Sequence, residues 1–293
     1  MESNQLLNPE FLRKLERLSV VAKKLYTGQM RGERRSSQRG ASVEFADYRN
    51  YSTGDDFRRV DWNVFARLEK LFLKLFIEEQ DLHVYVLLDT SRSMDFGTPT
   101  KLLYAKQIAA ALGYIALCNL DRVGFAALTN DIAETLRPKR GKQSAFAIFN
   151  YLESIEASLK TNLASSIRDF SLRTNQQGMV IIISDFFDEG YQKGVSSLLS
   201  RGFEVTLIQV LDEEEINPSI VGDLTLVDSE TGEKREVSIS QSMIKRYKER
   251  LSNHCSKIED FGLRYGCNYV QVSNQSDFES LILNYMRRRE VLK

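Results

Sequence analysis

The stretch His83-Val-Tyr-Val-Leu-Leu-Asp-Thr-Ser-Arg-Ser-Met94 is an apolar run that leads directly into a loop of oxygen-bearing side chains. A continuous apolar run of this length is typical of a strand that is buried on both faces. Asp89, Ser91 and Ser93 follow at alternate positions, so in a tight loop all three side chains can point at one centre. A carboxylate with two hydroxyls suits Mg²⁺ or Mn²⁺. The stretch therefore predicts half of a metal site at the end of a buried strand.

The other half is expected from elsewhere in the chain. The apolar run Val180-Ile-Ile-Ile-Ser184 ends in Asp185, and Thr161 stands in Lys-Thr-Asn-Leu just before a helical pattern. An alternative is that the Ser and Asp side chains of the first loop cap a helix by accepting its free backbone N–H groups. We favour a metal site, because the candidates coincide with the strand ends where ligands for a hard cation belong. The predicted ligands are Asp89, Ser91, Ser93, Thr161 and Asp185.

From residue 83 onward, patterns of strand and helix alternate. The expected strands are Val84–Leu88, Val123–Leu128, Ile132–Leu136, Val180–Ser184, Val205–Leu211 and Asn268–Val272, and the expected helices are Lys101–Asn119, Ala145–Leu159, Leu163–Arg173, Tyr191–Ser200 and Ser240–Arg264. This alternation predicts an α/β fold with a doubly wound, mostly parallel sheet of order 3-2-1-4-5-6, in which the strand at 132–136 is an antiparallel edge. Strands 1 and 4 are neighbours where the winding reverses, so Asp89 and Asp185 should meet there.

These residues resemble the metal-ion-dependent adhesion site of von Willebrand factor A domains. The resemblance covers Asp89-x-Ser91-x-Ser93, the later Thr161, and Asp185 in Ile-Ser-Asp, in that order. It implies a von Willebrand A-like, Rossmann-type fold with the N-terminal helix and a small β extension added to it. It also implies Mg²⁺ or Mn²⁺ as the cofactor.

Residues 40–79 mix dense charge with aromatic residues. Their elements are Glu44-Phe45, Arg49-x-Tyr51, Gly54-Asp55-Asp56, Asp61-Trp62 and Ala66-Arg67. This order resembles the signature of the domain-of-unknown-function family 58, in which such a segment precedes a von Willebrand A-like domain. Arginine pairs with carboxylates and stacks on rings, so the segment could be an ion-pair and aromatic network with Trp62 as its anchor, clasped to the next domain, or a surface for docking a partner. The weakly alternating pattern of residues 71–76 predicts an edge strand, which we expect to pair with residues 42–48.

The expected domain organisation has three parts. Residues 1–80 contain an N-terminal helix, beginning at Asn8-Pro9-Glu10, and the charged and aromatic segment. Residues 81–275 form the von Willebrand A-like domain with a hairpin insertion at 222–239, and residues 276–293 form a C-terminal helix. The hairpin is indicated by two short apolar runs around Glu230-Thr-Gly-Glu233.

Composition restricts the partners and the compartment. The 293 residues carry 40 basic and 40 acidic side chains, so no global field favours nucleic acid. The basic stretch from Arg13 to Arg39 lacks the interleaved aromatic residues that stack on bases. We find no apolar run long enough to span a membrane and no signal-peptide pattern, and we expect a cytoplasmic protein. Three cysteines outside any Cys-x-x-Cys pattern argue against disulfides or a zinc site.

Two classes of function remain. Phosphatases of the haloacid dehalogenase type also place an Asp-led loop after a parallel strand, but their second aspartate is replaced by Ser91 here, so the general acid is missing. No glycine-rich phosphate-binding motif occurs, and His83 and His254 are expected to be structural. We therefore predict a non-catalytic, metal-dependent protein-binding module, with a metal-dependent phosphohydrolase as the alternative.

The charge of the expected site indicates what such a module would bind. Only two carboxylates face the divalent cation, so the ion stays electrophilic and keeps a position for an Asp or Glu carboxylate from a partner. The family resemblance implies that the partner is a MoxR-type AAA+ ATPase or its client, with this chain as adaptor or chaperone-like protein.

Overall fold

The computed structural model describes residues 6–20, 43–78, 82–129, 135–158, 161–219, 222–227, 234–285 and 291–292. The chain divides into two compact units: a small one, Arg31–Asp81, and a large one that contains Met1–Met30 and Leu82–Lys293. The sequence grouped the N-terminal helix with the charged segment in residues 1–80. In the structure this helix belongs to the large unit instead, because Phe11 and Leu15 are buried in its core.

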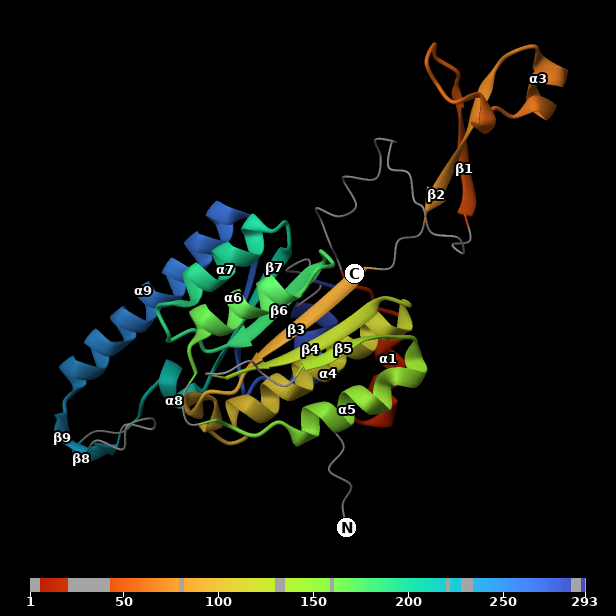
Figure 1. The fold of residues 1–293 in the computed structure, drawn as a ribbon. Helices are drawn as coiled ribbons and strands as arrows, with labels where there is room; N and C mark the ends of the chain where they lie inside the picture. Colours follow the sequence, from red (N-terminus) through yellow and green to blue (C-terminus); the bar gives the residue numbers. More distant parts are fainter. Residues whose placement is uncertain are drawn as a thin grey trace. The chain divides into compact units, whose positions relative to one another are not determined.

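The large unit contains a six-stranded sheet (Figure 1). Its strands are β3 (His83–Asp89), β4 (Arg122–Leu128), β5 (Thr135–Arg140), β6 (Met179–Ser184), β7 (Glu204–Leu211) and β10 (Asn268–Ser273). They lie in the order β10-β7-β6-β3-β4-β5, and all pairs are parallel except β4 with β5. Counted along the chain this is the order 3-2-1-4-5-6, so the predicted doubly wound sheet is confirmed.

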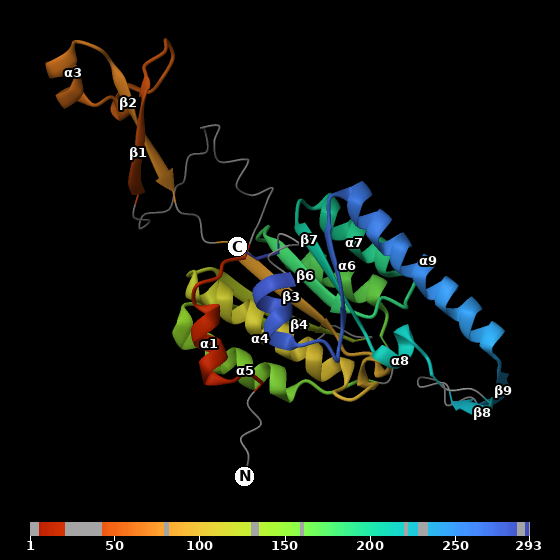
Figure 2. The same cartoon turned by 180° about the vertical axis from the view of Figure 1, so that it is seen from behind.

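Helices cover both faces of the sheet (Figures 1 and 2). The helices of one layer are α1 (Pro9–Leu15), α4 (Lys101–Cys118), α5 (Ala145–Ser154) and the short α10 (Phe278–Ser280), which a π-helical turn follows at Leu281–Tyr285. Those of the other layer are α6 (Leu163–Arg173), α7 (Tyr191–Ser200) and α9 (Gln241–Tyr265). Between β7 and α9 lie α8 (Glu213–Ile216) and an antiparallel hairpin of β8 (Gly222–Val227) and β9 (Lys234–Ile239).

Helix α4 is apolar on nearly all sides, as its sequence Lys-Leu-Leu-Tyr-Ala-Lys-Gln-Ile-Ala-Ala-Ala-Leu-Gly-Tyr requires. A helix without a polar face has to be covered all round. Packing between the sheet and the helices α1 and α5 provides this, and Ile108 and Leu112 have no exposed surface. The first residue of α4, Lys101, is thereby held at the edge of the sheet where the parallel strands end.

Three elements differ from the sequence prediction. The edge strand β5 covers Thr135–Arg140 and extends beyond the predicted end at residue 136, because it pairs with β4 down to Arg122; the predicted start at residue 132 lies outside the described residues. Helix α5 ends at Ser154 rather than at 159, because Ile155 is extended and the chain then runs to the loop after β3. The expected C-terminal helix is described only as α10 and the π turn, and residues 286–290 lie outside the described residues.

The small unit contains β1 (Val43–Asn50), η1 (Phe57–Arg59), α3 (Trp62–Leu68) and β2 (Phe72–Glu78). β1 and β2 pair antiparallel with Phe45 opposite Phe76, which confirms the predicted pairing. Asp61 is 5% exposed and accepts hydrogen bonds from the backbone N–H groups of Asn63 and Val64 and from the Tyr48 hydroxyl. The N-cap of α3 is therefore the buried polar centre of this unit.

The expectation that Trp62 anchors this network is wrong within the unit. Its indole is 57% exposed, and no residue of α3 is buried. Phe65 and Leu68 follow Trp62 at helical spacing and are 38% and 60% exposed. We call Trp62, Phe65 and Leu68 the α3 apolar face. Unlike Asp61, it contributes little to the folding of the unit.

We predict that Trp62→Ala leaves the amide protection of β1 and β2 nearly unchanged, within about 0.5 kcal/mol, because an exposed side chain loses little on truncation. Asp61→Ala should reduce this protection by about 1 kcal/mol or more, because the cap of α3 and the bond to Tyr48 are lost. Hydrogen exchange of the β1 and β2 amides measures both variants. A large loss of protection in Trp62→Ala would contradict the prediction.

Candidate metal centre

Two carboxylates end neighbouring parallel strands. β3 pairs with β6 so that Leu88 lies opposite Ile183, which brings Asp89 and Ser184 to the same height. The Ser184 hydroxyl donates to Asp89 Oδ2 at 2.6 Å. Asp185 is the next residue, and both Asp89 and Asp185 are only 2% exposed. The predicted meeting of the ends of strands 1 and 4 is what positions this pair.

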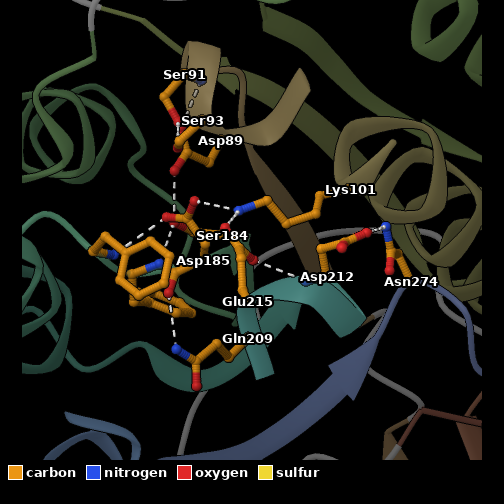
Figure 3. Close-up of polar contacts among 12 residues, drawn as sticks. Asp89, Ser91, Ser93, Lys101, Ser184, Asp185, Gln209, Asp212, Glu215 and Asn274 are labelled. Atoms are coloured by element: carbon orange, nitrogen blue, oxygen red, sulfur yellow. Dashed lines mark hydrogen bonds and ion pairs between the residues drawn. The ribbon is translucent and has the colours of Figure 1, made fainter. Parts of the chain in front are cut away.

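The loop after β3 gathers the first three predicted ligands (Figure 3). Asp89 Oδ1 accepts the backbone N–H of Ser91 at 2.9 Å, and the hydroxyls of Ser91 and Ser93 lie 3.0 Å apart. Ser91 precedes the short helix η2 (Arg92–Asp95), but its side chain does not cap that helix. The helix-cap alternative therefore does not account for the Ser91 hydroxyl, which contacts the Ser93 hydroxyl instead.

Asp185 is held on both sides. Its Oδ2 accepts from the Lys101 ammonium at 2.9 Å, and its Oδ1 accepts the backbone N–H of Phe187 at 3.2 Å. Between them, Phe186 is fully buried with a φ of 56°, a left-handed conformation that a bulky side chain seldom adopts. Its N–H donates to the Ser184 hydroxyl. Backbone strain of this kind occurs at binding sites, where the surrounding structure enforces it.

Thr161 lies between two anchored positions. On one side, the Ser158 N–H donates to the Thr90 carbonyl in the loop after β3 at 2.6 Å. On the other, the N–H of Leu163, the first residue of α6, donates to Asp188 in the loop after β6 at 3.0 Å. Thr161 Oγ1 is buried and has no hydrogen-bond partner in the described structure. A buried hydroxyl without a partner is costly, so it fits a ligand position.

The sequence analysis missed a buried lysine and its second partner. The Lys101 ammonium donates to Asp185 Oδ2 and, at 2.7 Å, to Glu215 Oε1, and its side chain has no exposed surface. Glu215 Oε2 accepts the N–H of Asp212, the N-cap of α8. One signal was available, because a lysine in the first turn of a helix faces the positive end of the helix dipole and needs carboxylates nearby.

The electrostatics show an excess of buried negative charge. Burial, and then the charge of Asp185, raise the pKa of Asp89 to about 6, although hydrogen bonds from Ser184 and Ser91 lower it. Burial opposes the charge of Lys101, but Asp185 and Glu215 outweigh it, so the pKa of Lys101 is raised. Lys101 therefore stays charged, and its ammonium pairs with two of the three carboxylates, Asp185 and Glu215.

The donor set fits a hard divalent cation. No group of three or more His, Cys, Asp or Glu suited to a metal occurs among the described residues. The candidate ligands are instead two carboxylates and three hydroxyls, one of which has no partner. Oxygen ligands of this kind suit Mg²⁺ or Mn²⁺ and do not suit softer metals.

The large unit is thus a doubly wound α/β domain with a cluster of oxygen-bearing side chains at its strand ends. The chain belongs to the family described as "Protein of unknown function DUF58", whose model matches residues 47–257. The uncharacterized protein Mb1516 of Mycobacterium bovis is 28% identical over 97% of this chain and 92% of its own length. The uncharacterized protein MAV169 of Mycobacterium avium is 25% identical over 45% of this chain and 78% of its own length.

Solved structures with a similar fold include the conserved hypothetical protein BatB from Bacteroides thetaiotaomicron, at a TM-score of 0.44 and 20% identity over 71% of this chain and 98% of that one. The VWA domain of SpRpn10 matches at a TM-score of 0.40 and 12% identity over 70% of this chain and 95% of that one. In the part of the chain that the structure describes, none of the helices combines the length and apolar character of a membrane span.

We predict that Asp89→Asn raises the melting temperature at pH 8 in the presence of chelator. The pKa of Asp89 is about 6 in the folded protein and 3.8 in the reference state, so the folded state binds more protons in this window. As the pH rises from the reference pKa of 3.8 through the folded pKa of about 6, the contribution of Asp89 to stability therefore falls, by an amount on the order of 1 to 3 kcal/mol. The advantage of Asn should be smaller at pH 5, which lies between the two pKa values, and should disappear only below pH 3.8, where Asp89 is protonated in both the folded and the unfolded state.

Thermal unfolding of both proteins at pH 5 and pH 8 measures this difference. Asp260→Asn, which removes an exposed carboxylate on α9, is the control and should show no such dependence. An Asp89→Asn variant that is less stable than the wild type by the same amount at both pH values would contradict the prediction.

Proposed function

We propose that this protein is a non-catalytic, divalent-metal-dependent protein-binding module. Its proposed ligands for Mg²⁺ or Mn²⁺ are Asp89, Ser91, Ser93, Thr161 and Asp185. The observation that carries the proposal is the pair of buried carboxylates at the ends of β3 and β6, with the hydroxyls of Ser91 and Ser93 in the loop that follows β3. Without a cation, burying two like charges together is unfavourable.

The proposed binding mode follows from the number of charged ligands. The hydroxyls of Ser91, Ser93 and Thr161 contribute no charge, so only Asp89 and Asp185 neutralise the ion. Part of the Asp185 charge is already offset by Lys101 at 2.9 Å. A divalent cation held this way keeps affinity for another anionic oxygen, and an Asp or Glu of a partner supplies one.

Several features support binding rather than hydrolysis. A phosphohydrolase of the haloacid dehalogenase type needs a second carboxylate two positions after its nucleophile, where this chain has Ser91. His254, the histidine near the centre, has its Nε2 within 3.1 Å of the Phe186 carbonyl and its ring against Phe187. A histidine engaged in this way is poorly placed to act as a general base.

The partner we propose is a MoxR-type AAA+ ATPase or a client of one. This part of the proposal rests on the family to which the chain belongs and on the binding mode described above. In such a pair the ATPase supplies the turnover, and the present chain serves as an adaptor that recognises an acidic residue through its metal.

We predict that the wild type binds Mg²⁺ or Mn²⁺ and that Asp89→Ala abolishes binding, because a directly coordinating carboxylate is lost. Thr161→Val should weaken binding while preserving the fold, because it removes only a hydroxyl that has no protein partner. Calorimetric titration measures both, with Thr174→Val, beyond the other end of α6, as the matched control. Absence of metal binding in the wild type, even with an acidic peptide present, would refute the metal site. Unchanged binding in Asp89→Ala would refute the ligand assignment.

We further predict that the purified protein does not hydrolyse phosphate esters with or without Mg²⁺, because Ser91 stands two positions after Asp89, where these phosphatases have their general acid. Release of phosphate from p-nitrophenyl phosphate is the measurement, and Asp89→Asn is the control. Metal-dependent hydrolysis by the wild type that Asp89→Asn abolishes would support the phosphohydrolase alternative instead.

A further inference from the structure

Lys101 is a fixed positive charge inside the candidate metal centre (Figure 3). Its ammonium lies 2.9 Å from Asp185 and 2.7 Å from Glu215, and 5.4 Å from the centroid of the Phe187 ring. The side chain has no exposed surface, and the side chain of Glu215 is 17% exposed. The two ion pairs join the strand end of β6, the start of α4 and the helix α8.

Stability alone does not explain this arrangement. Taking an ammonium and two carboxylates out of water carries a penalty that their attraction seldom exceeds, and apolar side chains at such positions are often as stable or more stable. Lys101 also stands in the first turn of α4, where the helix dipole disfavours a positive charge. A buried cation whose pairing is seldom a net gain in stability, in contact with a proposed metal ligand, indicates a role in the metal centre.

The role follows from the formal charges. Asp89, Asp185 and Glu215 contribute three negative charges and Lys101 one positive charge, so a bound divalent ion makes the cluster neutral. Without Lys101 the same cluster would hold the ion more tightly but would be negative overall and would repel an incoming carboxylate. Without the charge of Glu215 it would be positive, hold the ion more weakly and attract a carboxylate more strongly.

We propose that Lys101 is an electrostatic tuning residue that offsets Glu215, so that the bound metal keeps enough positive charge to accept a carboxylate from a partner. This inference rests on the proposed metal-dependent function and deepens it. In this proposal, the charges of Lys101 and Glu215 together set how tightly the centre binds the metal and how tightly the bound metal binds a carboxylate. Neither residue coordinates the ion in this arrangement.

The test is a charge series of Lys101→Met, Glu215→Gln and the double variant. Mn²⁺ affinity is measured by calorimetry, and acetate binding to the Mn²⁺-loaded protein is measured by the fall in water proton relaxation as acetate displaces water. Lys101→Met should bind Mn²⁺ at least about tenfold more tightly and acetate at least about tenfold more weakly, because one charge is worth a kcal/mol or more at these distances. Glu215→Gln should change both affinities in the opposite directions.

The double variant separates charge from position. Lys101→Met with Glu215→Gln restores the formal charge of the wild type while removing both ion pairs, so both affinities should return to within about threefold of the wild type. Lys14→Met with Glu279→Gln, a surface pair at 2.5 Å between α1 and α10, is the matched control and should change neither affinity. Circular dichroism identifies any variant that fails to fold. If Lys101→Met fails to fold, the affinities of Glu215→Gln and of the double variant test the tuning role.

The outcomes distinguish the tuning role from the function on which it rests. Opposite shifts in the single variants and recovery in the double variant support tuning. The proposal is overturned if Lys101→Met and Glu215→Gln shift a given affinity in the same direction, or if the double variant shows the same affinities as Lys101→Met. Lys101 would then act through its position alone, while metal and acetate binding by the wild type would still stand. A wild type that binds no Mn²⁺ overturns the metal-dependent function and the tuning role with it.

Discussion

The structure depends on one unfavourable arrangement, the burial of two carboxylates at the ends of adjacent parallel strands. Asp89 and Asp185 are almost a hundred positions apart in the chain, yet the register of β3 with β6 brings their strand ends together. No local preference opposes this, because the apolar runs that precede each residue are strongly favoured as buried strands. Folding of the sheet therefore forces the two charges together, and the surroundings have to make that tolerable.

The surroundings do so with hydrogen bonds and with a compensating charge. Asp89 receives the Ser184 hydroxyl and the Ser91 N–H, and Asp185 receives the Phe187 N–H and the Lys101 ammonium. The backbone adapts as well. Gly97, with a φ of 91°, approaches Asp212 so closely that a Cβ there would lie 2.0 Å from the carboxylate oxygen. The close approach of Gly97 to Asp212 packs the chain before α4 against the N-cap of α8, and Lys101 of α4 pairs with Glu215 of α8.

The sequence predicted what depends on local pattern. Helices α6 and α7 begin and end where predicted, and the sheet order followed from alternation and the winding rule. The ligand loop was predictable because Asp89, Ser91 and Ser93 are close in the chain. Glu215 stands 114 positions from Lys101, in an acidic run that resembles a solvated surface, so no local pattern joins the two. Trp62 was misjudged, because its indole is 57% exposed, while Arg49 of the segment pairs with Asp55.

The proposed metal centre would not select a partner unaided. Carboxylates occur on the surface of nearly every protein, so coordination to the ion supplies affinity and direction but little discrimination. Discrimination requires contacts with apolar and aromatic side chains, which dominate interface energies. The α3 apolar face has this composition, and the family match from residue 47 to 257 includes it together with the candidate ligands. Because this face is exposed within its own unit, it contributes little to folding, and its apolar and aromatic side chains remain available for contacts outside the unit.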